Sequence, residues 1–290
     1  MKSIRIAGVP EHFNYPWKIA IEQGLFQAAK LDVLWTDVPQ GTGRMCEMLR
    51  RDETDLAVIL TEGIVRDIAN GNPSCIVQVY VESPLLWGIH VWAGSPYRSV
   101  GDLKNKTVAV SRMGSGSHLM AAVHASFLGW DVSELRFEQV DTIDGAVDAL
   151  RSGRADYFMW ERFMTKPLVD NGTFRRLGDC PTPWPCFVIA VRDQFMEQDA
   201  SSVQVVLEII NAMTQQIRKP GLSEAIAENY SLNPEDVEDW LQLTRWSVLK
   251  PSEEMLNNVQ KHLLELSLIH KKATFTQLTC IAARCNDEES

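Results

Sequence analysis

The sequence lacks the features by which several large classes of proteins are recognised. No run of about 18 apolar residues occurs, so we predict no transmembrane helix and no insertion into a membrane. The six cysteines include no CxxC pair, and no HExxH, GxSxG, P-loop or dinucleotide-binding motif is present. We therefore predict no metal, no cofactor and no catalytic residue.

Basic residues are outnumbered by acidic ones. Lysine and arginine number 28 against 38 aspartate and glutamate residues, which gives a net charge of −10. Because contacts with phosphate backbones need clustered basic side chains, nucleic acid is not expected as a partner. A small anionic ligand is compatible with this charge, since a single arginine or a helix N-terminus can bind it.

The N-terminus shows no secretory leader. Residues 4–9 (IRIAGV) alternate like a β-strand directly after the first three residues, without a long apolar segment or a cleavage site. We therefore expect a cytoplasmic protein, for which a membrane-transporter partner is doubtful. In a reducing compartment the cysteines are expected to be free thiols, several of them buried. They are Cys46, Cys75, Cys180, Cys186, Cys280 and Cys285.

Two segments roughly 100 positions apart repeat one pattern. Residues 49–55 (LRRDETD) and residues 150–156 (LRSGRAD) each end a helical pattern, form a turn and lead through an aspartate into a buried strand. A glutamate follows each strand, at Glu62 and Glu161. The repeat indicates two α/β lobes of similar build, a type of fold that binds ligands at the carboxyl ends of its strands.

The chain between and around the repeats also alternates between strand and helix patterns. Such patterns run through residues 3–71 and again through residues 100–171, where the last is a helix over residues 161–171. This alternation indicates βαβ crossovers and mainly parallel sheets. Two apolar runs with no helix between them, residues 75–82 and 86–93, predict the crossing into the second lobe.

The lobes follow from the two crossings. We predict lobe I from residues 1–90 together with residues 188–290, and lobe II from residues 91–187, because the chain returns in a strand over residues 187–191. Two crossings form a hinge, and a hinge beneath a cleft suggests closure on a ligand. A chain of 290 residues is long enough to bury two such cores.

Five segments carry a resemblance to a known family. They are residues 16–26 (PWKIAIEQGLF), 40–44 (QGTGR), 56–71, 102–110 (DLKNKTVAV) and 114–118 (GSGSH). Their order and spacing resemble type II periplasmic-binding proteins, nearest to the substrate-binding proteins for thiamine-pyrimidine precursors and sulfonates. The resemblance implies an α/β, two-lobed type II periplasmic-binding-protein fold with a hinge and a central ligand cleft.

The same resemblance extends to enzymes. Fungal-type thiamine-pyrimidine synthases and cytoplasmic chorismate dehydratases are similar to this fold. The synthases carry a cysteine-rich metal motif and a cofactor-bearing lysine, whereas this chain offers only Cys180, Cys186 and Lys18 near the expected loops. A dehydratase needs little more than a positioned carboxylate or histidine. We therefore favour a binding protein. An enzyme is the alternative, and a protein-interaction module without a small-molecule ligand is the third hypothesis.

Loops at the carboxyl ends of the strands supply the candidate binding groups. Residues 10–17 combine aromatic rings with hydrogen-bonding groups, which suits a flat heterocycle, although these rings could also pack locally. Residues 114–118 precede a helix whose free N–H groups attract an anion, with Arg112 nearby, although an ordinary capped turn has the same sequence. The glutamates after the strands could bind an amino group or merely favour a helix N-terminus.

The candidate ligand-binding residues are Glu11, His12, Asn14, Tyr15, Trp17, Thr42, Gly43, Thr61, Glu62, Arg112, Gly114, Ser115, Gly116, Ser117, His118, Trp160 and Glu161. Together they favour a small polar metabolite that contains a ring, and we predict a thiamine-pyrimidine precursor. A sulfonate is the rival ligand. It would use residues 114–117 and Arg112 and leave the glutamates without a role.

Overall fold

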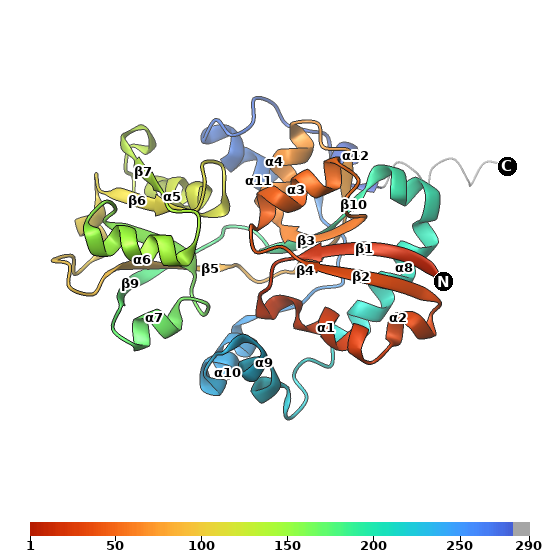
Figure 1. Ribbon diagram of the computed structural model, residues 1–290. Helices are drawn as coiled ribbons and strands as arrows, with labels where there is room; N and C mark the ends of the chain where they lie inside the picture. Colours follow the sequence, from red (N-terminus) through yellow and green to blue (C-terminus); the bar gives the residue numbers. More distant parts are fainter. Residues whose placement is uncertain (281–290) are drawn as a thin grey trace. The chain divides into compact units, whose positions relative to one another are not determined.

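The computed structural model describes residues 1–280, and these form two compact units. We call residues 1–83 with residues 184–280 lobe I, and residues 84–183 lobe II. The contacts therefore divide the chain a few residues before the boundaries predicted at residues 90 and 188. Each lobe has its own five-stranded sheet covered by helices (Figure 1).

The sheet of lobe I has the strand order β2-β1-β3-β10-β4. Its strands are β1 (Lys2–Gly8), β2 (Leu31–Asp37), β3 (Leu56–Leu60), β4 (Ser74–Val81) and β10 (Phe187–Arg192). The first three strands of the chain are parallel, as the alternation of strands and helices predicts, and the returning strand β10 runs antiparallel to both of its neighbours.

The sheet of lobe II repeats this order with a second set of strands, β7-β6-β8-β5-β9. They are β5 (Leu86–Trp92), β6 (Thr107–Val110), β7 (Arg136–Gln139), β8 (Tyr157–Glu161) and β9 (Phe174–Pro181). Here the crossing strand β5 is the antiparallel one, between β8 and β9. The two lobes therefore share one topology, as the sequence repeat predicts.

Short helices connect the strands, and longer ones follow the last strand of the chain. In lobe I they are η1 (His12–Asn14), α1 (Tyr15–Glu22), α2 (Leu25–Ala28), α3 (Thr42–Arg50), α4 (Thr61–Ala69), α8 (Asp193–Thr214), α9 (Leu222–Tyr230), α10 (Pro234–Leu243), α11 (Glu253–Glu265) and α12 (Phe275–Leu278). In lobe II they are η2 (Val100–Leu103), α5 (Gly116–Phe127), η3 (Val132–Glu134), α6 (Ile143–Ser152) and α7 (Lys166–Asp170).

The helix predicted over residues 161–171 is wrong in its first half. Glu161 is still part of β8, and α7 begins only at Lys166. The Thr165 hydroxyl donates to the Glu161 carbonyl (3.0 Å), which closes the turn between strand and helix. Instead of one long helix, this stretch contains the end of a strand, a turn and a short helix.

The repeated aspartates have the same backbone role in both lobes. The Asp55 carboxylate accepts the Arg5 N–H (2.9 Å), and the Asp55 N–H donates to the Arg5 carbonyl (2.9 Å). The Asp156 carboxylate accepts the Thr107 N–H (2.8 Å), and the Asp156 N–H donates to the Thr107 carbonyl (2.8 Å). Each aspartate thus ties the start of the third parallel strand to the first.

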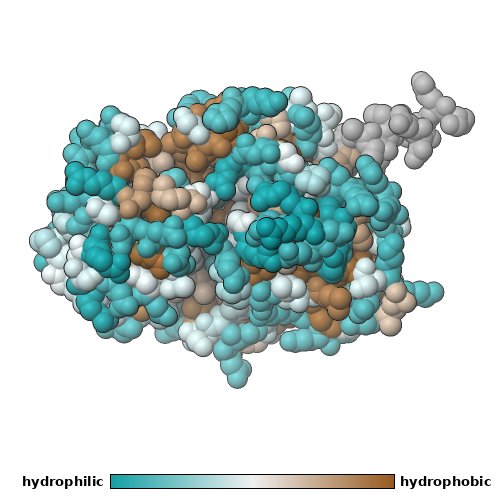
Figure 2. All heavy atoms as spheres, turned by 45° about the horizontal axis from the view of Figure 1, so that its top comes forward, coloured by the Kyte–Doolittle hydropathy of each residue, from teal (hydrophilic) through white to brown (hydrophobic). Residues whose placement is uncertain are grey.

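Apolar side chains from the strands fill the two cores, and the surface is mostly polar. In lobe I, Ile6, Val58 and Ile189 on three neighbouring strands are completely buried. Figure 2 shows hydrophilic residues over most of the face in view, with hydrophobic residues in separate patches. Among residues 1–280, no helix is long and apolar enough to cross a membrane.

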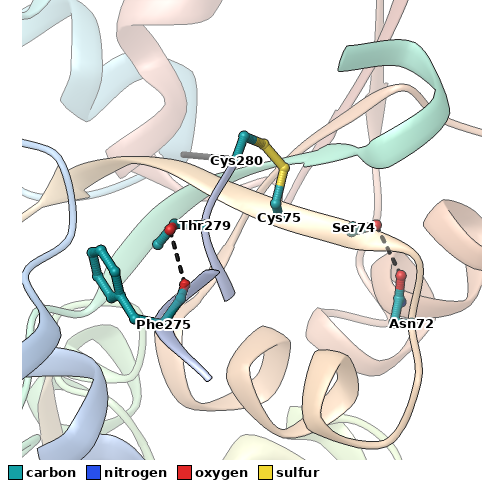
Figure 3. The surroundings of a disulfide bond; sticks show 6 residues. All are labelled: Asn72, Ser74, Cys75, Phe275, Thr279 and Cys280. Atoms are coloured by element: carbon teal, nitrogen blue, oxygen red, sulfur yellow. Dashed lines mark hydrogen bonds between the residues drawn. A yellow bond between two sulfur atoms is a disulfide. The ribbon is translucent and has the colours of Figure 1, made fainter. Parts of the chain in front are cut away.

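The expectation of six free thiols is wrong for one pair of cysteines. Cys75 in β4 and Cys280 after α12 form a disulfide across 205 positions of sequence (Figure 3). Cys46, Cys180 and Cys186 are buried free thiols, as expected. The remaining cysteine, Cys285, lies outside the described residues. The pairing escaped the sequence because nothing in its spacing shows that the C-terminal segment returns to an edge strand.

Candidate functional site

The loop after β1 places a histidine in an aromatic environment. The His12 ring packs against Trp240, with 4.1 Å between ring centroids, and against Phe13 at 4.9 Å. Both His12 nitrogens are buried and have no hydrogen-bond partner among residues 1–280. Burial lowers the pKa of His12 to about 3, so its ring is neutral near pH 7.

The polar neighbours of His12 differ in their roles. Burial raises the pKa of Glu11 to about 7, which makes this carboxyl sensitive to pH in the neutral range. The Asn14 amide donates to the Val9 carbonyl (2.8 Å) and so fixes the loop itself. Tyr15 packs edge-on against Tyr230, with 6.2 Å between centroids. Of the candidates in this loop, His12 has two buried polar atoms without a hydrogen-bond partner among residues 1–280, and Asn14 has one, its Oδ1.

Trp17 lies in the core of lobe I. Its side chain is completely buried and stacks on Trp35 (5.6 Å between centroids) and Phe26 (6.2 Å). These contacts explain the aromatic residue at this position by packing. They favour the alternative that the ring of Trp17 packs locally.

The starts of α3 and α4 bring further candidates together. Thr42 is the first residue of α3, next to Gly43, and its methyl group lies so close to Gly63 that a Cβ at that position would collide with it. Thr61 opens α4, and its hydroxyl donates to the Pro185 carbonyl (2.6 Å). The glycine at position 63 therefore allows the two helix starts to approach each other.

Glu62 is the candidate with the most distinctive environment. Its carboxyl group is almost completely buried, with 1% of the residue exposed, and Oε2 accepts the Trp184 indole N–H (2.8 Å). Its Oε1 has no hydrogen-bond partner among residues 1–280, and neither has the buried Thr42 hydroxyl. Burial raises the pKa of Glu62 to about 7, and the Trp184 N–H offsets only part of this rise.

Trp184 was not among the candidate residues, although it supplies the only hydrogen bond to Glu62 from a side chain that the described residues show. Its ring also packs edge-on against His262 on α11, with 5.5 Å between centroids. The only signal for it in the sequence was an aromatic residue within a proline-rich turn, residues 181–185. That signal does not indicate a partner 122 positions away.

In lobe II the turn before α5 gathers several candidate hydroxyls. Ser115 is the N-cap of α5, and its hydroxyl accepts the His118 N–H (3.4 Å). The Ser117 hydroxyl accepts the Ser111 N–H (3.0 Å), and the Gly114 N–H donates to the His118 ring (3.1 Å). Most of these groups therefore already bond within the turn.

Gly114 and its neighbours still have features that suit an anion. Gly114 has a positive φ of 78°, a conformation that glycine adopts without strain. Gly116 is the first residue of α5, a helix of 12 residues whose N-terminus carries partial positive charge. Arg112 lies half-buried in the same turn. The turn is therefore both a capped helix start and a positively polarised surface.

Glu161 differs from Glu62 in its hydrogen bonding. Its Oε2 accepts the Met164 N–H (2.7 Å), so this buried carboxylate stabilises the turn after β8. The neighbouring Trp160 is half-buried and stacks on Phe158, with 5.4 Å between centroids. Among residues 1–280, no group of three or more histidine, cysteine, aspartate or glutamate side chains could hold a metal.

Part of the chain is similar to a known protein family. The model of the Ca3427-like PBP family matches residues 87–180, which form most of lobe II. A Candida albicans protein, the CA3427 gene product, is 26% identical, with a TM-score of 0.86 over 94% of this chain and 92% of that one. It is described as defining a new family of proteins with the generic periplasmic-binding-protein fold.

Two sulfonate-binding proteins share the fold at lower identity. The alkanesulfonate-binding protein SsuA from Xanthomonas axonopodis pv. citri, bound to MOPS, is 18% identical, with a TM-score of 0.83 over 96% of this chain and 98% of that one. The aliphatic sulphonate binding protein SsuA from Escherichia coli is 19% identical, with a TM-score of 0.77 and coverages of 96% and 92%. No curated protein matches the chain.

The chain shares the generic periplasmic-binding-protein fold of these structures. The predicted α/β fold class is thereby confirmed. In this periplasmic-binding-protein-like chain, the candidate residues divide between the lobes. Lobe I holds Glu11, His12, Asn14, Tyr15, Trp17, Thr42, Gly43, Thr61 and Glu62, whereas lobe II holds Arg112, Gly114, Ser115, Gly116, Ser117, His118, Trp160 and Glu161. Their roles as ligand contacts stay predictions.

Proposed function

We propose that this protein binds a small polar metabolite that contains a ring and that Glu62 is its main polar contact in lobe I. The observation that carries the proposal is the buried Glu62 carboxyl, whose Oε1 has no partner among residues 1–280. Leaving a buried carboxylate oxygen unpaired is costly, so such an oxygen is well suited to accept a hydrogen bond from a ligand. The position of the ligand between the lobes stays a prediction from the sequence.

The chemistry around Glu62 favours a ligand with hydrogen-bond donors. An ionised carboxylate accepts hydrogen bonds, and those from cationic donors such as an amidinium group are stronger than those from neutral donors. The unpartnered Thr42 hydroxyl nearby can donate to a ring nitrogen or accept from an amino group. An aminopyrimidine offers both kinds of group on one flat ring. We therefore propose a thiamine-pyrimidine precursor as the ligand.

A sulfonate is the second candidate ligand, and different observations favour it. The turn before α5 combines the N-terminus of a 12-residue helix with Arg112, and such helix ends bind anions. Two structures that share the fold are sulfonate-binding proteins. However, an ionised Glu62 would repel a sulfonate if the two came close, and the sulfonate would give Oε1 no donor.

A thermal-shift experiment separates the two ligands. The aminopyrimidine precursor of thiamine and a short alkanesulfonate are each added to the native protein, to Glu62→Gln and to Arg112→Gln. A ligand at about 100 times its Kd adds roughly 2.7 kcal/mol to the free energy of unfolding. We expect the aminopyrimidine to raise Tm in the native protein and in Arg112→Gln, but much less in Glu62→Gln. A shift with the sulfonate alone, lost in Arg112→Gln, would replace the first candidate by the second.

A further inference from the structure

The C-terminal segment of lobe I is joined covalently to an edge strand. The sheet order places β4 at one edge, and Cys75 is the second residue of that strand. Cys280 follows α12, and its Cα lies 5.5 Å from that of Cys75, a separation typical of disulfides. Figure 3 shows the bond beside Thr279, whose hydroxyl donates to the Phe275 carbonyl.

Apart from this bond, few backbone contacts hold the segment on the strand. Along the other half of β4, residues 245–249 make three backbone hydrogen bonds of 2.8–2.9 Å with residues 79–82. Near Cys75, by contrast, the segment makes one isolated bridge, between Ile76 and Thr279, and buries Leu278. The disulfide is therefore a main element that keeps residues 275–280 at this edge.

The disulfide lies at the wall of an open cavity of about 500 Å³ within lobe I. Both cysteines line it, together with Asp193 and Glu197 from the start of α8. The residues that line it include no lysine or arginine. Cys280 is half-buried, whereas Cys75 is only 5% exposed, so an incoming thiol reaches the Cys280 sulfur more easily.

We propose that Cys75–Cys280 is a site of thiol–disulfide exchange that controls the docking of the C-terminal segment, and that it reacts preferentially with neutral or cationic thiols. An external thiolate attacks the Cys280 sulfur, and Cys75 leaves as a thiolate that takes up a proton from water. A second external thiol then attacks the mixed disulfide, which releases the Cys280 thiol and an external disulfide. Two electrons thus pass from two external thiols to the protein.

The selectivity follows from the charges at the cavity. Asp193 and Glu197 line the same cavity as the disulfide, and their negative charges repel an anionic thiolate reagent while they attract a cationic one. After reduction, residues 275–280 keep the isolated bridge, the buried Leu278 and the packing of α12 on β4, α4 and α11, but no covalent link. They then leave the edge of β4 more often. The predicted cytoplasmic location would favour the reduced form, and an oxidising compartment the disulfide.

The first test measures selectivity by charge. The native full-length protein is treated with cysteamine or with 2-mercaptoethanesulfonate, and alkylation followed by mass spectrometry gives the rate at which Cys75 and Cys280 become free. The same rates in urea-unfolded protein correct for the intrinsic reactivity of each thiol. We expect a native preference for cysteamine of about threefold or more that shrinks at high salt and in Glu197→Gln. If the ratio of the rates with cysteamine and 2-mercaptoethanesulfonate is the same in native and unfolded protein, the proposed selectivity is wrong.

The second test measures docking by hydrogen exchange. We expect reduction of the native protein to speed amide exchange in residues 275–280 about tenfold or more, while residues 245–249 stay protected. Cys280→Ser should reproduce this pattern, and the matched control Cys285→Ser should not. If amide exchange in residues 275–280 stays unchanged after the disulfide is shown to be reduced, the disulfide does not control the docking of the segment. Free thiols at both positions after air oxidation of the native protein would overturn the site itself. Neither test depends on the metabolite proposed above.

Discussion

The two lobes share one strand order but differ in the charges that surround their repeated aspartates. Asp55 in lobe I is 4% exposed and contacts two guanidinium groups, with 2.6 Å to the Arg5 Nη2 and 3.2 Å to the Arg192 Nη2. Asp156 in lobe II is half-buried and accepts the Tyr97 hydroxyl at 2.5 Å. The backbone role is the same in both lobes, so the fold requires the aspartate but not the charge of its partners.

The helix starts of the two lobes also differ, in whether their polar side chains form hydrogen bonds within the protein. In lobe I neither α3 nor α4 has a side-chain cap, and Thr42 and Glu62 there keep unpartnered polar atoms within the described residues. In lobe II the hydroxyls of Ser115 and Thr142 cap α5 and α6, and Glu161 accepts a backbone N–H. At these positions, polar side-chain atoms of lobe I lack hydrogen-bond partners among the described residues, whereas those of lobe II form hydrogen bonds that stabilise the lobe. The open groups are the ones that a ligand can satisfy.

The largest effect is expected from the pH dependence of Glu62. Burial raises its pKa in the folded protein to about 7, above the value of about 4.3 for an unfolded glutamate. The folded state therefore holds the proton more tightly, and stability falls as the pH rises from about 4.3 to about 7. Glu62→Gln removes this loss, so without ligand we expect the variant to be more stable than the native protein at pH 8, by about 3–4 kcal/mol, and nearly equal to it near pH 4.5.

Urea denaturation at both pH values provides the measurement. Glu161→Gln is the control, because it changes a buried carboxyl group of lobe II that already accepts the Met164 N–H. A Glu62→Gln variant that is less stable than the native protein at pH 8 would show that the ionised carboxylate is satisfied within the protein. That result would remove the main support for Glu62 as an open group.

An intermediate effect is expected from matched substitutions of the aspartates. Asp55→Asn removes the buried carboxylate that Arg5 and Arg192 share and leaves Arg192 with the exposed Asp52 as its remaining acidic partner (2.7 Å), so we expect the free energy of unfolding to fall by about 2 kcal/mol. Asp156→Asn weakens hydrogen bonds only, and the expected loss is about 1 kcal/mol. Urea denaturation followed by tryptophan fluorescence measures both. Equal losses would show that the charged partners of Asp55 contribute little.

The smallest effects are expected at the helix starts. Ser115→Ala removes the cap of α5 and should cost about 1 kcal/mol. Thr42→Val replaces a hydroxyl that has no partner among residues 1–280, so without ligand it should change stability by less than about 0.5 kcal/mol. Thermal denaturation of the two variants tests the contrast. A large loss in Thr42→Val would mean that its hydroxyl is already hydrogen-bonded in the protein.

The sequence predicted the fold because its signals are local. The helix and strand periods and the repeated aspartates indicate two parallel α/β lobes without reference to distant residues. Strand β9, Phe174–Pro181, was missed because its sequence (FRRLGDCP) shows no clear alternation and its partner β5 lies far away in sequence. Pairing with a distant strand, rather than local propensity, places it in the sheet.

The sequence predicts which residues follow the strands, but it does not predict their contacts, and their role as a binding site stays a prediction. The end of β3 indicates that Glu62 belongs to a binding edge, yet its open oxygen depends on which partners reach it. One of these is Trp184, which comes from the returning crossing. The local packing of Trp17 and the bond from Met164 to Glu161 likewise depend on neighbours that the sequence pattern does not specify.

The most direct test of the account is isothermal titration of the aminopyrimidine precursor into the native protein, Glu62→Gln and Glu161→Gln at pH 8. If lobe I supplies the open carboxylate, Glu62→Gln should weaken binding by about tenfold or more, which is 1.4 kcal/mol, whereas Glu161→Gln should weaken it by less than about threefold. Equal losses in both variants, or native affinity in Glu62→Gln, would contradict the claim that the two lobes use their buried glutamates differently.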